Sequence, residues 1–188
     1  FTDNTCQQTL SSVLTLPISP SIFSDTALCQ LNYQVSGTQV AAPGGYWTYT
    51  SNNPQSTLTF TPNITSANPA ISANNSGVFT LTFTDSVCNH SATTQLELYV
   101  QPHIDVDSIG CDYATQIQGT ISALGGTWSC QDTALHISNI HDINPSLVTD
   151  YAGVYTLFFL DSACSTILQA TIEFPPYMYL ALLDTNIC

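Results

Sequence analysis

Apolar and polar residues alternate along several short stretches of the chain. Every second side chain is apolar in residues 31–35, 79–83 and 155–159. This period places one set of side chains on the buried face of a β-strand and the other set on the exposed face. Threonines occupy the alternate positions 80, 82 and 84, as expected for the exposed face of a strand. The pattern predicts β-strands.

Turn-forming residues separate these stretches. Clusters of Gly, Pro, Asn and Ser recur at intervals of about 8–12 residues, a spacing typical of β-sandwiches. No segment combines a helical period with capping residues. We therefore expect an all-β fold.

Three sequence phrases recur with a shared period. FTDNTC at residues 1–6 returns as FTDSVC at 83–88 and as FLDSAC at 159–164. DTALC at 25–29 returns as DSIGC at 107–111 and as DTNIC at 184–188. Gly-Gly-x-Trp ends at Trp47 and at Trp128, 81 residues further on. Matching intervals in three independent phrases predict tandem copies of one structural unit.

Prolines mark the junctions between these copies. They follow strand-like runs at Pro17, Pro102 and Pro175. We expect residues 1–17 to be the end (strands F and G) of a preceding repeat, 18–101 and 102–175 to be two whole repeats, and 176–188 to begin a following one. Short proline-bearing linkers are stiff, which predicts a rod-like array.

The charge composition excludes several functions. The 188 residues include 13 acidic side chains and no Lys or Arg, and only 7% are charged. Lys and Arg neutralise phosphates, so their absence argues strongly against nucleic acids as partners and removes the usual clamps for phosphorylated substrates. No apolar run approaches the length of a membrane span. Stability must come from apolar burial, hydrogen bonds and cross-links.

The cysteine content indicates the compartment. Seven cysteines occur without a metal-type CxxC pair, a pattern typical of disulfides in an oxidising, extracellular environment.

Residues 150–157 resemble the approach to strand F of immunoglobulin domains, with Tyr155 as the corner tyrosine. Leu81 and Leu157 stand where that family carries a core cysteine. Trp47 and Trp128 match the strand-C tryptophan, and we interpret them as core aromatics and not as ligand contacts. The expected core residues are Trp47, Trp128, Leu81, Leu157, Phe79 and Tyr155.

The order Cys, Gly-Gly-x-Trp, Gly-Val-[Phe/Tyr]-Thr-Leu, Asp-Ser-x-Cys over residues 25–174 resembles the Ig/PKD-like repeats of giant Bacteroidota surface proteins. Those repeats are associated with type IX secretion, gliding or adhesion, and include hook-like filaments of marine predatory species. The resemblance implies tandem immunoglobulin-like β-sandwiches at the cell surface, in an adhesin or filament shaft that associates with copies of itself.

The immunoglobulin-like topology sets which cysteines can meet. Cys29 lies at the start of strand B, at the C-terminal end of its repeat, and Cys88 lies just past strand F, at the N-terminal end. Such a pair lies beyond the Cα separation of about 7 Å that a disulfide tolerates. Across a junction the two kinds of end meet, which predicts an inter-repeat Cys29–Cys164 disulfide. The cysteines then expected to pair with repeats outside the sequence are Cys6, Cys88, Cys111 and Cys188.

Other pairings stay open. A shifted topology would join Cys29 to Cys88 and Cys111 to Cys164, and links between chains are a third pattern. Cys130 replaces Tyr49 of the first repeat. It is either a buried free thiol that behaves as a small hydrophobe or the site of an intermolecular bond.

Other candidate chemistry is sparse. We expect His90, His103, His136 and His141 to be solvated loop residues, since the gap between His136 and His141 does not suit one strand face. Asp105 and Asp107 share one side of a strand and are a weak candidate site for Ca²⁺, the one cofactor considered. Nothing resembles a catalytic motif, so an enzyme is not expected.

Two functions remain. The first is the shaft of an extracellular filament or adhesin that packs sideways with its own copies. The second is an adhesive module that recognises a glycan or protein on another cell. An apolar stripe repeated on both repeats would favour the shaft, and exposed aromatics at loop tips would favour the module.

Overall fold

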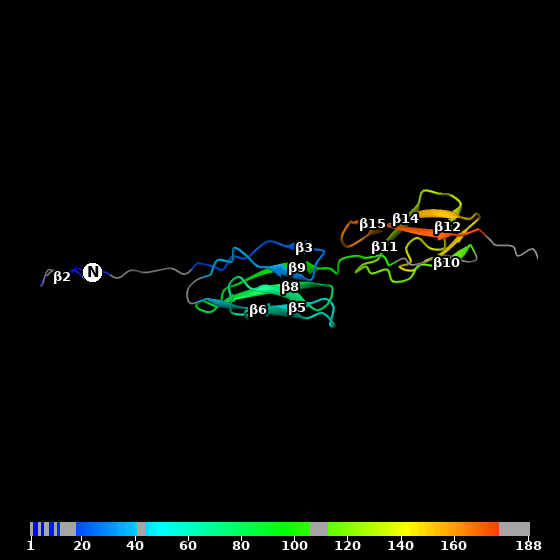
Figure 1. The fold of residues 1–188 in the computed structure, drawn as a ribbon. Coiled ribbons are helices and arrows are strands. Elements are labelled where there is room, and N and C mark those ends of the chain that lie inside the picture. Colours follow the sequence, from blue (N-terminus) through cyan, green and yellow to red (C-terminus); the bar gives the residue numbers. More distant parts are fainter. Residues whose placement is uncertain are drawn as a thin grey trace, which may run out of the picture.

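The computed structural model describes residues 18–40, 44–105 and 113–176, together with Thr2, Asp3, Thr5, Gln8, Thr9 and Ser11. These residues form strands and turns, with no helix among them. Near the N-terminus β1 (Thr2–Asp3) pairs with β2 (Gln8–Thr9). Two further bodies follow one another along the long dimension of the molecule (Figure 1).

The first body is a sandwich of two sheets. Its strands are β3 (Thr26–Leu28), β4 (Asn32–Gln34), β5 (Gly45–Ser51), β6 (Leu58–Thr61), β7 (Ala70–Ala73), β8 (Gly77–Asp85) and β9 (Ser91–Leu98). One sheet has the order β3-β9-β8-β5 and the other β4-β7-β6. Every pair is antiparallel except β3 with β9. In immunoglobulin letters these sheets are A′GFC and BED.

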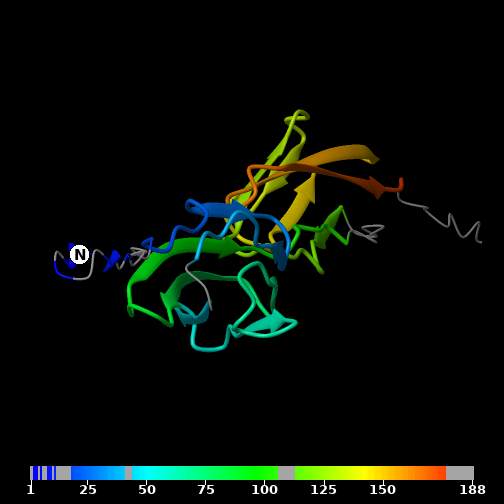
Figure 2. The same ribbon diagram turned by 90° about the vertical axis from the view of Figure 1, so that its left-hand side faces the viewer.

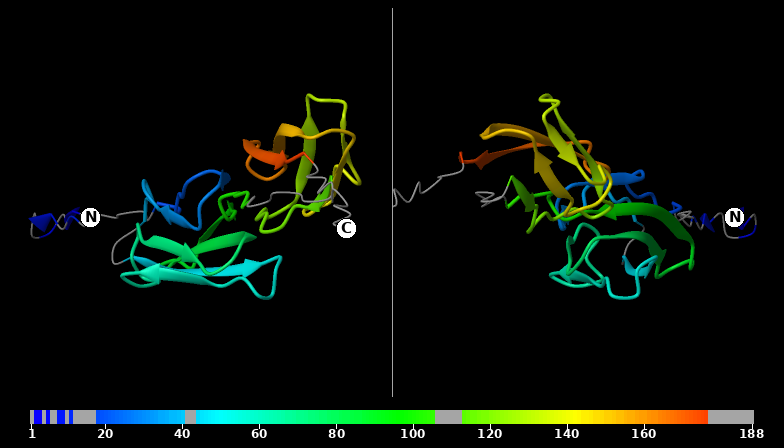
Figure 3. Two further views of the ribbon diagram at one scale, coloured as in Figure 1. Left: turned by 45° about the vertical axis from the view of Figure 1, so that its right-hand side comes forward. Right: turned by 90° about the vertical axis from the view of Figure 1, so that its right-hand side faces the viewer.

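The second body repeats this order. Its strands are β10 (Ala114–Gln116), β11 (Gly126–Cys130), β12 (Leu135–Ile137), β13 (Ser146–Thr149), β14 (Gly153–Asp161) and β15 (Ile167–Phe174). The sheets are β11-β14-β15 and β10-β13-β12, which correspond to CFG and BED. Figure 2 shows the first body in front, and Figure 3 separates it from the yellow-to-orange strands of the second. The predicted all-β fold of tandem immunoglobulin-like sandwiches is confirmed.

Each body has its own hydrophobic core. Trp47 and Trp128 are both 1% exposed, on β5 and β11. The alternation of β8 and β14 sends every second side chain into these cores, as the sequence pattern indicates. The six residues named from the sequence are all buried: Trp47, Phe79, Leu81, Trp128, Tyr155 and Leu157.

The Gly-Gly-x-Trp phrase starts strand C where two backbones approach closely. Gly125 adopts a φ of 71°, in the left-handed region that favours glycine. Gly126 has no room for a Cβ, which would collide with the carbonyl of Leu160 and the ring of Phe159. Gly45 occupies the same place in the first body and is equally confined. The two glycines therefore let β11 and β5 begin against strand F.

Each tryptophan also anchors a loop. The backbone N–H of Trp128 donates to the carbonyl of Ile140 (2.8 Å), and its indole Nε1 donates to the carbonyl of Asp142 (2.9 Å). Trp47 makes the corresponding two bonds in the first body. Both loops carry Asn-Ile-x-x-x-Asn-Pro, at residues 63–69 and 139–145. This is a fourth repeated phrase beside the three named from the sequence, and its spacing of 76 residues fits the period.

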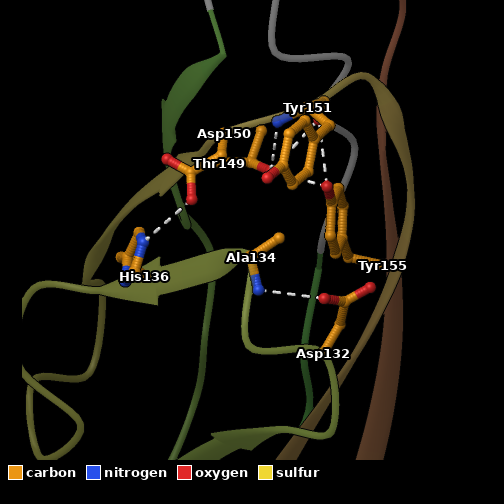
Figure 4. A network of polar contacts seen from close by, with 7 residues as sticks. All are labelled: Asp132, Ala134, His136, Thr149, Asp150, Tyr151 and Tyr155. Atoms are coloured by element: carbon orange, nitrogen blue, oxygen red, sulfur yellow. Dashed lines mark hydrogen bonds and ion pairs between the residues drawn. The ribbon is translucent and has the colours of Figure 1, made fainter.

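Tyr155 forms a corner that the first body lacks (Figure 4). Its hydroxyl donates to the carbonyl of Tyr151 (3.0 Å) and accepts a hydrogen bond from the hydroxyl of Thr149 (2.6 Å). Phe79 occupies the same position in the first body and has no hydroxyl. The corner therefore ties the turn before strand F in the second body only.

Tyr155→Phe should destabilise the second body by about 1–3 kcal/mol, because both hydrogen bonds of the Tyr155 hydroxyl are lost, each worth about 0.5–1.5 kcal/mol. Amide hydrogen exchange in urea, followed separately for β8 and β14, measures this change. Tyr151→Phe alters a 66% exposed ring and is the matched control. Equal protection of β14 in the wild type and in Tyr155→Phe would contradict the role of the corner.

Candidate functional site: the joint between the repeats

A disulfide joins the two bodies. Cys29 lies directly after β3, and Cys164 lies in the turn between β14 and β15. Their Cα atoms are 5.7 Å apart, while 135 residues separate them in the sequence. This is the inter-repeat pair named from the sequence. The alternative pairs Cys29–Cys88 and Cys111–Cys164 are not formed, because the sulfurs of Cys29 and Cys164 are already bonded to each other.

A buried carboxylate shapes the turn that presents Cys164. Asp161 is 1% exposed, and its Oδ1 accepts the backbone N–H of Cys164 at 2.7 Å. Its other oxygen accepts a hydrogen bond from the hydroxyl of Ser122. Ser165 follows with a φ of 50°, which turns the chain into β15. The Asp-Ser-x-Cys phrase is therefore a capped F–G turn that holds its cysteine at the joint.

The first body contains the same turn. Asp85 is 1% exposed, and its Oδ1 accepts the backbone N–H groups of Val87 (2.7 Å) and Cys88 (2.9 Å). Asn89 follows with a φ of 56°. Cys88 is a half-buried free thiol. The two turns thus have the same backbone conformation and the same capping aspartate. They differ in the bonding state of their cysteine.

The linker adds a second connection. The N–H of Tyr99 donates to the carbonyl of Leu28 at 2.9 Å, which extends the pairing of β3 to the end of the first body. Burial, followed by the hydrogen bond and charge of Glu97, raises the pKa of Tyr99. Tyr99 also lines a small hollow together with Ala123 and Leu124 of the second body. The two bodies are therefore joined at the disulfide, and residues of both line this hollow.

The remaining cysteines fall into two groups. Cys130 is a free thiol on β11, partly buried and packed against the second core. Cys6, Cys111 and Cys188 lie outside the described residues, so their expected pairings remain predictions.

The histidines do not gather. His136 lies on β12, so the prediction of a loop position was wrong for it; the alternation of Leu135–Ile137 turns its ring to solvent. Its Nε2 is 3.5 Å from Oδ2 of Asp150 (Figure 4). His141 lies in a loop, with Nδ1 3.3 Å from the hydroxyl of Thr127.

No set of three or more metal-ligating side chains occurs within the described ranges. Asp107, half of the suggested calcium pair, lies outside those ranges, and Asp105 is exposed. Within the same ranges no helix is long and apolar enough to cross a membrane.

The outer faces of the two large sheets differ. On the first body, Thr48, Thr82 and Thr93 form one row across β5, β8 and β9. On the second, Leu160 and Ile167 are paired across β14 and β15 and are 47% and 66% exposed. Among the described residues, these two outer faces therefore share no apolar stripe of the kind that would favour lateral packing along the whole array.

Comparisons with known proteins assign no family to this chain. No protein-family model matches the chain, and no curated protein does. Similar solved structures include tandem immunoglobulin domains of titin (14% identity, 87% of this chain and 99% of that one, TM-score 0.39). The D00-D0 domain of intimin is 10% identical in sequence. The match covers 83% of this chain and 98% of that one, with a TM-score of 0.37. The N-terminal four Ig domains of Dscam1 are 11% identical in sequence. The match covers 89% of this chain and 48% of that one, with a TM-score of 0.46. The fold assignment rests on strand order and register.

Replacing Cys29 with Ser should loosen the joint, because the linker would then be the one covalent connection between the bodies. Small-angle X-ray scattering should show a broader distribution of interatomic distances, while the strand content by circular dichroism stays unchanged. Cys130→Ser removes a cysteine away from the joint and is the control. A scattering profile of Cys29→Ser that superimposes on the wild type would show that the disulfide does not fix the joint.

Proposed function

We propose that this chain is a segment of the shaft of an extracellular surface filament or adhesin, with its tandem repeats stapled end to end by disulfides. The observation that carries the proposal is the Cys29–Cys164 bond, which connects consecutive repeats and not the two sheets of one sandwich. Immunoglobulin-like domains more often use a disulfide between strands B and F, where this chain has leucines at strand F. A bond placed at the joint instead stiffens the array. Disulfides of this kind persist outside the reducing cytosol.

The turn at Cys88 supports further disulfides between consecutive repeats. Its capping carboxylate, the hydrogen bond that this carboxylate accepts from the cysteine N–H, and its left-handed residue match those of the turn at Cys164. We therefore assign Cys88 to a cysteine of a preceding repeat. By sequence, Cys111 occupies the position of Cys29 and is assigned to a following repeat.

The surface is compatible with packing against copies of the same chain. Threonines on the first body and the Leu160–Ile167 pair on the second carry no charge. Two such faces meet without a buried charge to desolvate. The net charge of −13 acts between copies at longer range and is screened within about 8 Å at physiological salt. Lateral contact would therefore be favoured in saline surroundings and weakened at low ionic strength.

Electron microscopy of the native assembly tests the shaft. We expect fibres with a beaded repeat, one bead for each sandwich, and neighbouring chains in lateral contact. Isolated chains without lateral neighbours would remove self-association and leave a monomeric stalk. Discrete particles with no fibre would reject the shaft and favour the adhesive module.

The bonding state of Cys88 in the native protein tests the series of staples. Because the chain has no Lys or Arg, trypsin cannot cut it, and a protease that cuts at aromatic or acidic residues is used instead. After alkylation without reductant, Cys88 should be recovered in a disulfide-linked peptide pair. Cys130 should be recovered alkylated, as an internal control. An alkylated Cys88 would limit the staple to Cys29 and Cys164.

A further inference from the structure

The Cys29–Cys164 bond closes a covalent loop that contains nearly all of both sandwiches. The loop spans a sequence separation of 135 residues and includes every strand from β4 to β14. It holds both tryptophans and the linker between the bodies. Of the strands in the two bodies, only β3 and β15 lie outside it.

Each of these two strands runs between the joint and the far end of its own body. β3 runs parallel to β9, whose end leads into the linker, so β3 enters from the far end of the first body and reaches Cys29 at the joint. β15 starts after Cys164 at the joint and runs antiparallel to β14, toward the far end of the second body. Both strands are already extended, at about 3.3 Å per residue. Together with the disulfide, the two strands form one continuous covalent path through both bodies.

We propose that the Cys29–Cys164 disulfide is a tension bypass, in which a pull between the two ends of this segment runs through β3, the disulfide and β15 and cannot lengthen the residues inside the loop, which make up most of both hydrophobic cores. Tension acts on the shortest covalent path between the points of pulling, and a segment inside a closed loop cannot be extended by it. The role of this bypass in the organism rests on the proposed shaft, which is loaded along its length.

The bypass changes what happens under load. Without the disulfide, tension would pass through strand B onward in the first body and would unfold each sandwich in turn, because each has a separate core. With it, the unfolding of a core adds no length between the ends. The array would therefore resist lengthening even where one sandwich is weak.

Single-molecule force spectroscopy of the 188-residue chain, held at its two ends, tests the bypass. The oxidised chain should show no unfolding step the size of a sandwich. After addition of a reductant to the same molecules, two steps should appear. The gain in contour length should be about 450 Å, from a loop separation of 135 residues at about 3.3–3.6 Å per residue.

Two cysteine variants test whether this disulfide causes the difference between the oxidised and the reduced chain. Cys164→Ser should lengthen like the reduced chain under oxidising conditions, while Cys130→Ser should stay short like the oxidised wild type. If Cys164→Ser fails to fold, the wild type with and without reductant provides the same contrast. Release of the full length by the oxidised wild type would overturn the bypass. This measurement uses isolated molecules, so its outcome is separate from the imaging that decides whether the native protein forms a fibre.

Discussion

The covalent bond between consecutive repeats is the constraint on which the arrangement of this chain depends. Each sandwich has its own core and needs no partner for its topology. Their mutual placement, in contrast, depends on the short linker and on Cys29–Cys164. In a chain without Lys or Arg, ordinary salt bridges cannot supply this rigidity. A disulfide does so independently of salt and charge.

Recurring local structures place that bond. A glycine pair lets strand C start against strand F, and the following tryptophan anchors the loop that precedes strand E. A buried aspartate at the end of strand F then caps the turn that presents the cysteine. Each phrase conserves a backbone conformation, which explains why the phrases persist while the outer faces change from threonine-rich to apolar between the two repeats.

Much of this architecture was predictable from the sequence. The period-two alternation fixes the strands, and the shared interval of three phrases fixes the repeat, since both follow from backbone geometry. The pairing of Cys29 with Cys164 follows from the ends of the sandwich at which each cysteine lies. The roles of Asp85 and Asp161 did not emerge, because a carboxylate that caps a turn looks in sequence like any surface acid. His136 was misplaced because β12 has only three residues, too few for a periodic signal.

The central claim is that the disulfide spans two repeats, and the partner of Cys29 in the native protein tests it most directly. Proteolysis at acid pH prevents exchange of disulfides, and mass spectrometry then identifies the linked peptides. The account predicts a pair that contains Cys29 and Cys164. Recovery of Cys29 linked to Cys88 would contradict it, because the bond would then lie within one sandwich.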